Sequence, residues 1–161
     1  MTYNDRRTKL VFNKTLNVFT LRSIMNIHTI ATHLNQLQDA TETGFNFDCT
    51  PIEGDIDVLQ VEIIGREEIP IFLSISDNQI LCIAYLWGED EVKADLKANM
   101  IEAMLEMNIP MPLSSFAKVE DKYVVFGALS INSTLDDIEL EIVTLSDNSL
   151  EVISEMETYL K

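Results

Sequence analysis

The clearest pattern of apolar and polar positions covers the last part of the chain, where apolar residues recur at alternating spacings of three and four. Only a helix places residues at these spacings on one face. Ser133 or Thr134 is expected to cap this helix, and Asp136 and Asp137 follow in the first turn, where the helix dipole favours acidic side chains. The face that the pattern predicts comprises Leu135, Ile138, Ile142, Leu145, Ser149, Val152, Met156 and Tyr159.

A second apolar stripe makes the apolar surface of this helix wider than a surface helix of a small domain needs. Two interpretations stay open. Either the sheet and the first helix bury both stripes, or the chain forms a homodimer through this helix or through the helix that follows Asp90. The second stripe comprises Leu140, Val143, Leu150 and Ile153, and we count these residues in a candidate interaction surface.

Shorter patterns predict the other elements. Alternation of apolar and polar residues indicates strands with one solvated face, and the short turns between them favour antiparallel pairing. Gly127, inside an apolar strand, is typical of a bulge or a close backbone approach. The predicted fold class is α+β, an antiparallel sheet with packed helices in the order α-β-β-β-α-β-β-α. Before the final helix we expect a helix from Asn26 to about Gln38, a short strand around Phe45 and Phe47, strands at 58–64, 69–75 and 80–86, a helix at 91–108, and strands around Phe116 and Val124.

The first 24 residues differ from the rest in composition. They hold five basic residues and one acidic residue, a net charge of +4, and show no helical or strand period. A signal peptide is not predicted, because Asn13, Lys14 and Thr15 interrupt the apolar stretch that follows Arg6 and Arg7. We expect 1–24 to be a loose basic extension or an over-extended start, and 25–161 to form one α+β domain. No apolar run approaches the roughly 20 residues that a membrane-spanning helix needs.

Residues 25–161 are strongly acidic, with six basic and 26 acidic residues and a net charge of −20. Such a charge disfavours nucleic acid and anionic membrane, and a basic protein segment is the partner that electrostatics favours. The alternative is that the acids only keep the protein in solution. Trp87, followed by Glu89, Asp90 and Glu91, is the candidate aromatic anchor with an acidic surround, and these four complete the candidate interaction surface.

No catalytic, metal or cofactor motif is found, and we predict that the protein is not an enzyme. Cys49 and Cys82 lack metal-site spacing, and a reduced, buried thiol is the expectation for Cys82, which lies among apolar residues. His28 and His33 are five residues apart and cannot share one ligand-bearing face of a helix. The methionines of 91–108 are consistent either with core filling or with an adaptable binding groove.

The last fifty residues resemble the bacterial YjfI-like family, a domain of unknown function. The resemblance lies in Met-Pro-Leu-Ser-Ser at 111–115, Tyr-Val-Val-Phe-Gly-Ala-Leu-Ser at 123–130, and Leu-x-Asp-Ile-x-Leu-Glu-Ile at 135–142. It implies a cytoplasmic protein, a weak link to envelope stress, a phage-shock-protein-A-like partner, and no catalytic residues. The order of elements also resembles the fold shared by type III secretion chaperones and the YbjN-like regulators, which implies a small, acidic, non-enzymatic and dimeric protein that binds protein segments.

Together these observations favour a protein-binding adaptor or chaperone-like regulator. The alternative is a sensor that holds a small ligand between sheet and helices. An exposed apolar patch with an acidic rim would favour the first function, and a closed pocket with convergent polar groups would favour the second.

Overall fold

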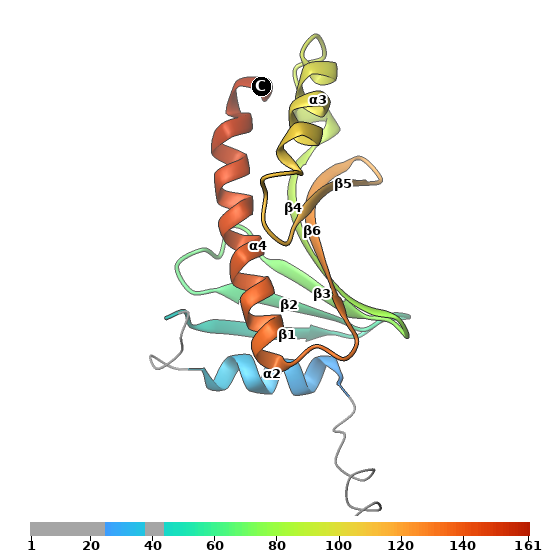
Figure 1. Ribbon diagram of the computed structural model, residues 1–161, viewed down its shortest axis with the longest axis vertical. Coiled ribbons are helices and arrows are strands. Elements are labelled where there is room, and N and C mark those ends of the chain that lie inside the picture. The colour runs from blue at the N-terminus through green and yellow to red at the C-terminus, as the bar shows by residue number, and fades with distance from the viewer. Residues whose placement is uncertain (1–24, 38–43) are drawn as a thin grey trace, which may run out of the picture.

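The computed structural model describes residues 25–37 and 44–161, which form one six-stranded antiparallel sheet with helices on one of its faces (Figure 1). The α+β class predicted from the sequence is confirmed. No helix among the described residues is long and apolar enough to cross a membrane. The elements are α2 (Ile27–Gln36), β1 (Phe47–Ile52), β2 (Val58–Ile63), β3 (Ile71–Ile75), β4 (Gln79–Gly88), the short 3-10 helix η1 (Glu89–Glu91), α3 (Lys97–Met107), β5 (Ser115–Val119), β6 (Lys122–Ser130), α4 (Leu135–Met156) and the 3-10 helix η2 (Glu157–Tyr159).

The strands lie in the order β1-β2-β3-β4-β6-β5. Four strands precede α3, where the sequence pattern counted three, because β1 joins the sheet along its whole length and pairs with β2 from Phe47 to Ile52. The sequence pattern predicted a short strand only around Phe45 and Phe47. In the structure Pro51 lies in an edge strand, the place where a sheet tolerates proline.

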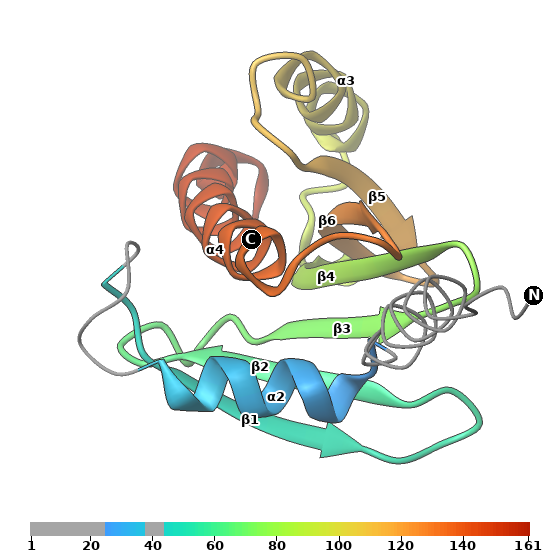
Figure 2. The ribbon, with the colours of Figure 1, turned by 60° about the horizontal axis from the view of Figure 1, so that its bottom comes forward.

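Helices α2 and α4 cover the same face of the sheet, α2 over β1 to β3 and α4 over β3, β4 and β6 (Figure 2). The buried side of α2 comprises Ile27, Ile30, Ala31 and Leu34. The capping of α4 predicted from the sequence is confirmed, since the Thr134 hydroxyl accepts from the Asp137 N–H and the Asp137 carboxylate accepts from the Thr134 N–H. A strong local cap therefore fixes where this long helix begins.

The segment between β4 and α3 differs from the prediction of one helix over 91–108. Val92 pairs with Leu160 in an isolated antiparallel bridge, and the Lys93 N–H donates to the Tyr159 carbonyl at 2.9 Å. This contact with the end of the chain holds Val92 in an extended conformation, a turn follows at 94–96, and α3 begins only at Lys97. The prediction for 1–24 lies outside the described residues, whereas α2 ends at Gln36, slightly before the end predicted near Gln38.

Candidate functional site

One face of the sheet carries no helix, and its side chains are mostly apolar. The register identifies this face. Gly127 packs against Glu141 of α4 and pairs with Cys82, so the alternate residues Ile83 and Phe126 point away from the helices. We call this surface the open face, and its centre comprises Phe72, Leu81, Ile83, Tyr85 and Phe126.

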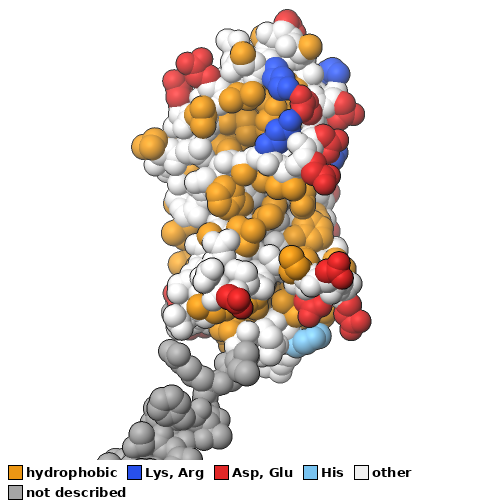
Figure 3. Space-filling view, turned by 90° about the vertical axis from the view of Figure 1, so that its right-hand side faces the viewer, with side chains coloured by type: hydrophobic (Ala, Val, Ile, Leu, Met, Phe, Trp, Pro, Cys, Tyr) orange, Lys and Arg blue, Asp and Glu red, His pale blue; other side chains and the backbone are white. Residues whose placement is uncertain are grey.

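The centre of the open face is uncharged, and charged groups lie around it. Tyr85 is 42% exposed, and its ring meets Phe72 edge to face with centroids 5.7 Å apart. On the neighbouring strands Glu62 of β2 and Asp48 of β1 occupy outward positions. Figure 3 shows hydrophobic side chains along the middle of this side of the molecule, with acidic side chains around them and basic side chains beside their upper part. An apolar patch with a polar rim is the usual composition of a protein interface.

Two continuous apolar runs in the sequence are a signal for this face that the periodicity of apolar positions does not capture. Residues 80–86 are apolar at every position, and so are most of 123–129. A strand with only one buried face alternates, whereas a continuous apolar run indicates apolar surface on both faces. Because the helices cover only one face of β4 and β6, the other side of each run becomes the open face.

A groove of about 320 Å³ lies between α3 and the edge strand β5, close to one end of the sheet. Its walls include Ile101 and Leu105, which are 39% and 64% exposed. Lys97 and Lys118 also line it, and both form ion pairs with Glu89. The hydrogen bonds from Lys118 and Lys97 hold the pKa of Glu89 well below its usual range. The methionines Met100 and Met104 of α3 are buried and fill the core.

The predicted anchor at Trp87 lies in the interior. Its side chain is only 4% exposed and packs beside Tyr123, with the ring centroids 6.2 Å apart and the rings tilted by 38°. The nearby acids have structural partners: Glu89 pairs with two lysines, and the Glu91 carboxylate accepts from the Gly88 N–H at 2.6 Å. Asp90 is exposed, and its carbonyl accepts from the Lys161 ammonium. A partner on this structure would therefore need another aromatic anchor.

The second apolar stripe of α4 divides into two kinds of position. Leu140 and Leu150 are 53% and 41% exposed. Val143 is buried, and Ile153 is half-buried against the core. The stripe is therefore partly core and partly surface, and self-association through α4 stays a prediction.

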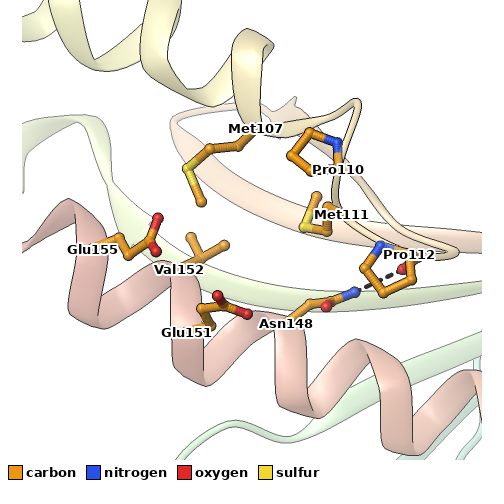
Figure 4. Close-up of a pocket in the computed structure, with 8 residues that line it drawn as sticks. All are labelled: Met107, Pro110, Met111, Pro112, Asn148, Glu151, Val152 and Glu155. Carbon is orange, nitrogen blue, oxygen red and sulfur yellow. Dashed lines mark hydrogen bonds between the residues drawn. The ribbon is translucent and has the colours of Figure 1, made fainter.

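Asn148 of α4 forms two hydrogen bonds with the loop between α3 and β5. The Asn148 amide donates to the Pro112 carbonyl at 2.8 Å and to the Ser114 hydroxyl at 2.9 Å (Figure 4). Between these two contacts Leu113 adopts a φ of 58°, a conformation that costs free energy for a leucine. The two hydrogen bonds on either side hold the chain in it.

A cavity of about 160 Å³ lies between this loop and α4. Met107 and Met111 form one wall, and Glu151 and Glu155, one turn apart on α4, bring two carboxylates to the other (Figure 4). The thioether side chains can contact the aliphatic part of a lysine or arginine side chain, and the two carboxylates can bind its charged group. The cavity is small, and it holds few polar groups besides these acids and Asn148.

Glu141 is a buried acid at the contact between α4 and the sheet. The residue is 2% exposed, and its Oε1 atom has no hydrogen-bond partner. It faces Gly127, where an added Cβ would lie 1.5 Å from the same oxygen. Burial raises the pKa of Glu141 above its ordinary value. The close approach that the sequence predicted at Gly127 is therefore made by this carboxyl, while the sheet's irregularity lies in β4, between Tyr85 and Trp87.

Replacing Glu141 with glutamine is expected to raise Tm at pH 7 by roughly a few degrees. An acid whose pKa is raised by folding favours the fold below its ordinary pKa of 4.5 and loses that contribution as pH rises through the raised value. The advantage of Glu141→Gln should therefore shrink as pH falls from the raised pKa toward 4.5, and it should be absent below 4.5. Thermal melts of both proteins across this range measure the difference, and an advantage that persists at low pH would contradict a charge effect.

The two cysteines are free and buried, as expected for Cys82. Burial, with Asp48 adding to it, raises the pKa of Cys49 to about 12, and burial raises that of Cys82 as well. Both thiols therefore stay protonated at neutral pH, which removes the thiolate that a nucleophilic cysteine needs.

Comparison with known sequences identifies the family. Residues 27–160 match DUF2170, described as an uncharacterized protein conserved in bacteria. The chain belongs to this family. YjfI of Escherichia coli K12 is 49% identical over 53 residues, which are 30% of this chain and 40% of that relative, and YjfI of E. coli O157:H7 matches equally. The match therefore spans less than half the length of these relatives.

Two solved structures share the fold. The crystal structure of YbjN from E. coli has a TM-score of 0.57 at 17% identity, and the match covers 84% of this chain and 93% of that one. A chain of the ExsC–ExsE complex has a TM-score of 0.51 at 12% identity, with coverages of 80% and 90%. The resemblance to the secretion-chaperone-like and YbjN-like architecture is confirmed. At these identities the likeness shows the fold alone.

Proposed function

We propose that this protein is a non-enzymatic, protein-binding adaptor or chaperone-like regulator that takes up a segment of another protein on the open face. The observation that carries the proposal is the set of apolar side chains, centred on Ile83, Tyr85 and Phe126, that no described helix covers. Burial of apolar surface contributes about 25 cal/mol per Å² removed from water, so a partner that covers this area gains free energy.

The charge around the open face favours a basic segment. The described part of the chain is strongly acidic, and the acids near the open face include Glu62 and Asp48. Acidic rim groups speed the encounter with a basic partner and make it sensitive to salt, while the apolar centre holds the complex. The cavity beside Glu151 and Glu155 offers a second place for a basic side chain.

The structural neighbours support a protein as the partner. One neighbour was solved as the complex of ExsC with ExsE, and another, YbjN, is proposed as a transcription regulator. A phage-shock-protein-A-like protein is the partner that the YjfI-like resemblance implies, and it is the first candidate to assay. A small-ligand sensor is less well supported, because the cavity of about 160 Å³ is small for a ligand and the groove of about 320 Å³ is lined mainly by apolar side chains.

Site-specific photo-crosslinking tests the proposal. A photoreactive residue replaces Tyr85 on the open face in one protein and Leu150 on α4 in another, since the two positions are 42% and 41% exposed. We expect the Tyr85 position to give a specific adduct with another protein in cells, and the Leu150 position to give none.

The other outcomes have definite meanings. Adducts from Leu150 alone would move the interaction to α4. Adducts between two copies of this chain would support a homodimer, and light scattering would then give twice the mass of one chain. If neither position gives an adduct, the open face is not a binding surface and the proposal is wrong.

A further inference from the structure

The first turns of α4 and the end of α2 bring together three side chains of metal-binding type. His33 of α2 lies beside Asp136 and Glu139 of α4, and one ligand atom from each lies within 4.8 Å of the other two. The His33 Nε2 atom is 3.9 Å from the Asp136 Oδ1 atom. Asp136 and Glu139 are three residues apart, so both project from the same side of the helix.

The imidazole nitrogen provides a second observation. The His33 Nε2 atom is buried and has no hydrogen-bond partner, although it faces two carboxylates. Buried polar atoms nearly always have a partner, and an orphaned one calls for an explanation such as a bound ion. The helix cap does not occupy Asp136, because Thr134 bonds with Asp137 instead.

We propose that His33, Asp136 and Glu139 bind a divalent first-row transition ion, with Zn²⁺ as the ion to test. Imidazole nitrogen with carboxylate oxygen suits Zn²⁺ and its neighbours, while Mg²⁺ and Ca²⁺ prefer oxygen ligands alone. Zinc bonds to these atoms are about 2.0–2.2 Å long, which brings the ligand atoms to within about 3.5 Å of one another. Asp136 is exposed, so its side chain can move by the small distance required.

The charge and the position of the site both favour this ion. The chain around it is strongly acidic, which raises the local concentration of cations. Three protein ligands leave a coordination position for water. Because the ligands come from α2 and α4, the ion joins these two helices, and its binding energy adds to the stability of the folded state.

Sequence spacing did not reveal this cluster. Local sequence motifs for zinc have ligands only a few residues apart, whereas His33 and Asp136 are separated by most of the chain. The chain has two histidines. His28 lies on the same helix outside the cluster and therefore provides a matched control.

Calorimetric titration of the full, EDTA-treated chain with ZnCl₂ tests the site. We expect one ion per chain, with an affinity that falls at least tenfold in His33→Ala and in Asp136→Asn and stays unchanged in His28→Ala. Zn²⁺ should also raise Tm in the wild type and in His28→Ala but not in His33→Ala. Thermal melts in EDTA show whether His33→Ala still folds. If His33→Ala does not fold, Asp136→Asn still tests the site, because Asp136 is exposed and its replacement should leave the fold intact.

Three results would overturn the site. Zinc affinity that is equal in the wild type and in both His33→Ala and Asp136→Asn would mean that scattered surface acids bind the ion. Competition by Ca²⁺ at the same concentration as Zn²⁺ would also mean that surface acids, and not this site, bind the ion. Absence of a saturable heat change with the wild type would mean that the cluster is an ion pair between His33 and Asp136 and nothing more.

Discussion

Replacing Gly127 with alanine is expected to lower the free energy of unfolding by roughly 2–3 kcal/mol. The added Cβ would lie 1.5 Å from Oε1 and 2.7 Å from Cδ of Glu141, and 3.2 Å from the Leu113 carbonyl oxygen. The carboxyl must therefore move, and it has no open space because Glu141 is 2% exposed. Overpacking a filled interior forces side chains and backbone out of their preferred positions.

Urea unfolding of a double-mutant cycle checks this explanation. Glu141→Ala removes the carboxyl that Gly127→Ala would strike, so the double variant should recover much of the loss, with a coupling of about 1 kcal/mol or more. Glu151→Ala, an exposed position on the same helix, is the control and should add to Gly127→Ala without coupling. Additive losses with Glu141→Ala would mean that the glycine is needed for another reason.

Local patterns predicted the elements of this fold because local forces determine them. The cap at Thr134 and the helix after it depend on residues a few positions apart, and both were predicted correctly. The segment around Val92 was predicted as helix, since nothing nearby shows that it pairs with Leu160 at the other end of the chain. Strand β1 was only partly predicted, because Pro51 is compatible with a strand only at the edge of a sheet.

The candidate site was harder to predict because it depends on which faces of the elements remain uncovered. Periodicity identifies an apolar side chain but does not say whether a helix covers it. Trp87 therefore looked like an anchor and is buried, while Tyr85, two residues earlier, is exposed on the open face. The β4 irregularity between these two residues shifts the register, and this shift is visible only once β6 is paired.

The roles of Glu141 and of the 110–114 loop also could not be predicted from local sequence patterns. Glu141 lies next to Ile142 in a helix rich in acids, and the sequence does not distinguish it from the exposed Glu151. Only the packing of α4 on β6 places its carboxyl over Gly127. Asn148 likewise becomes structural because the 110–114 loop passes over it. Such residues are predictable from the sequence only when the tertiary neighbours are known.

Changing Tyr85 to a charged residue is expected to weaken partner binding at least tenfold, because a buried aromatic anchor is among the largest contributors to interface energy. Tyr85 is 42% exposed, so the substitution should leave the fold intact apart from the ring contact with Phe72, worth about 1 kcal/mol. Leu150→Lys, at a position of equal exposure on α4, is the matched control and should bind the partner normally.

The sign of the introduced charge separates the apolar and the electrostatic parts of the proposed interaction. Tyr85→Lys and Tyr85→Glu both remove the ring, but only lysine repels a basic segment, so Tyr85→Lys should bind more weakly than Tyr85→Glu at low salt. The difference should become small near 1 M salt, where the screening length is about 3 Å. Affinities of both variants for the crosslinked partner, measured across ionic strength, decide the matter. Equal binding of the two variants at low salt would show that the partner segment is not basic, and unchanged binding in both would show that the open face does not bind it.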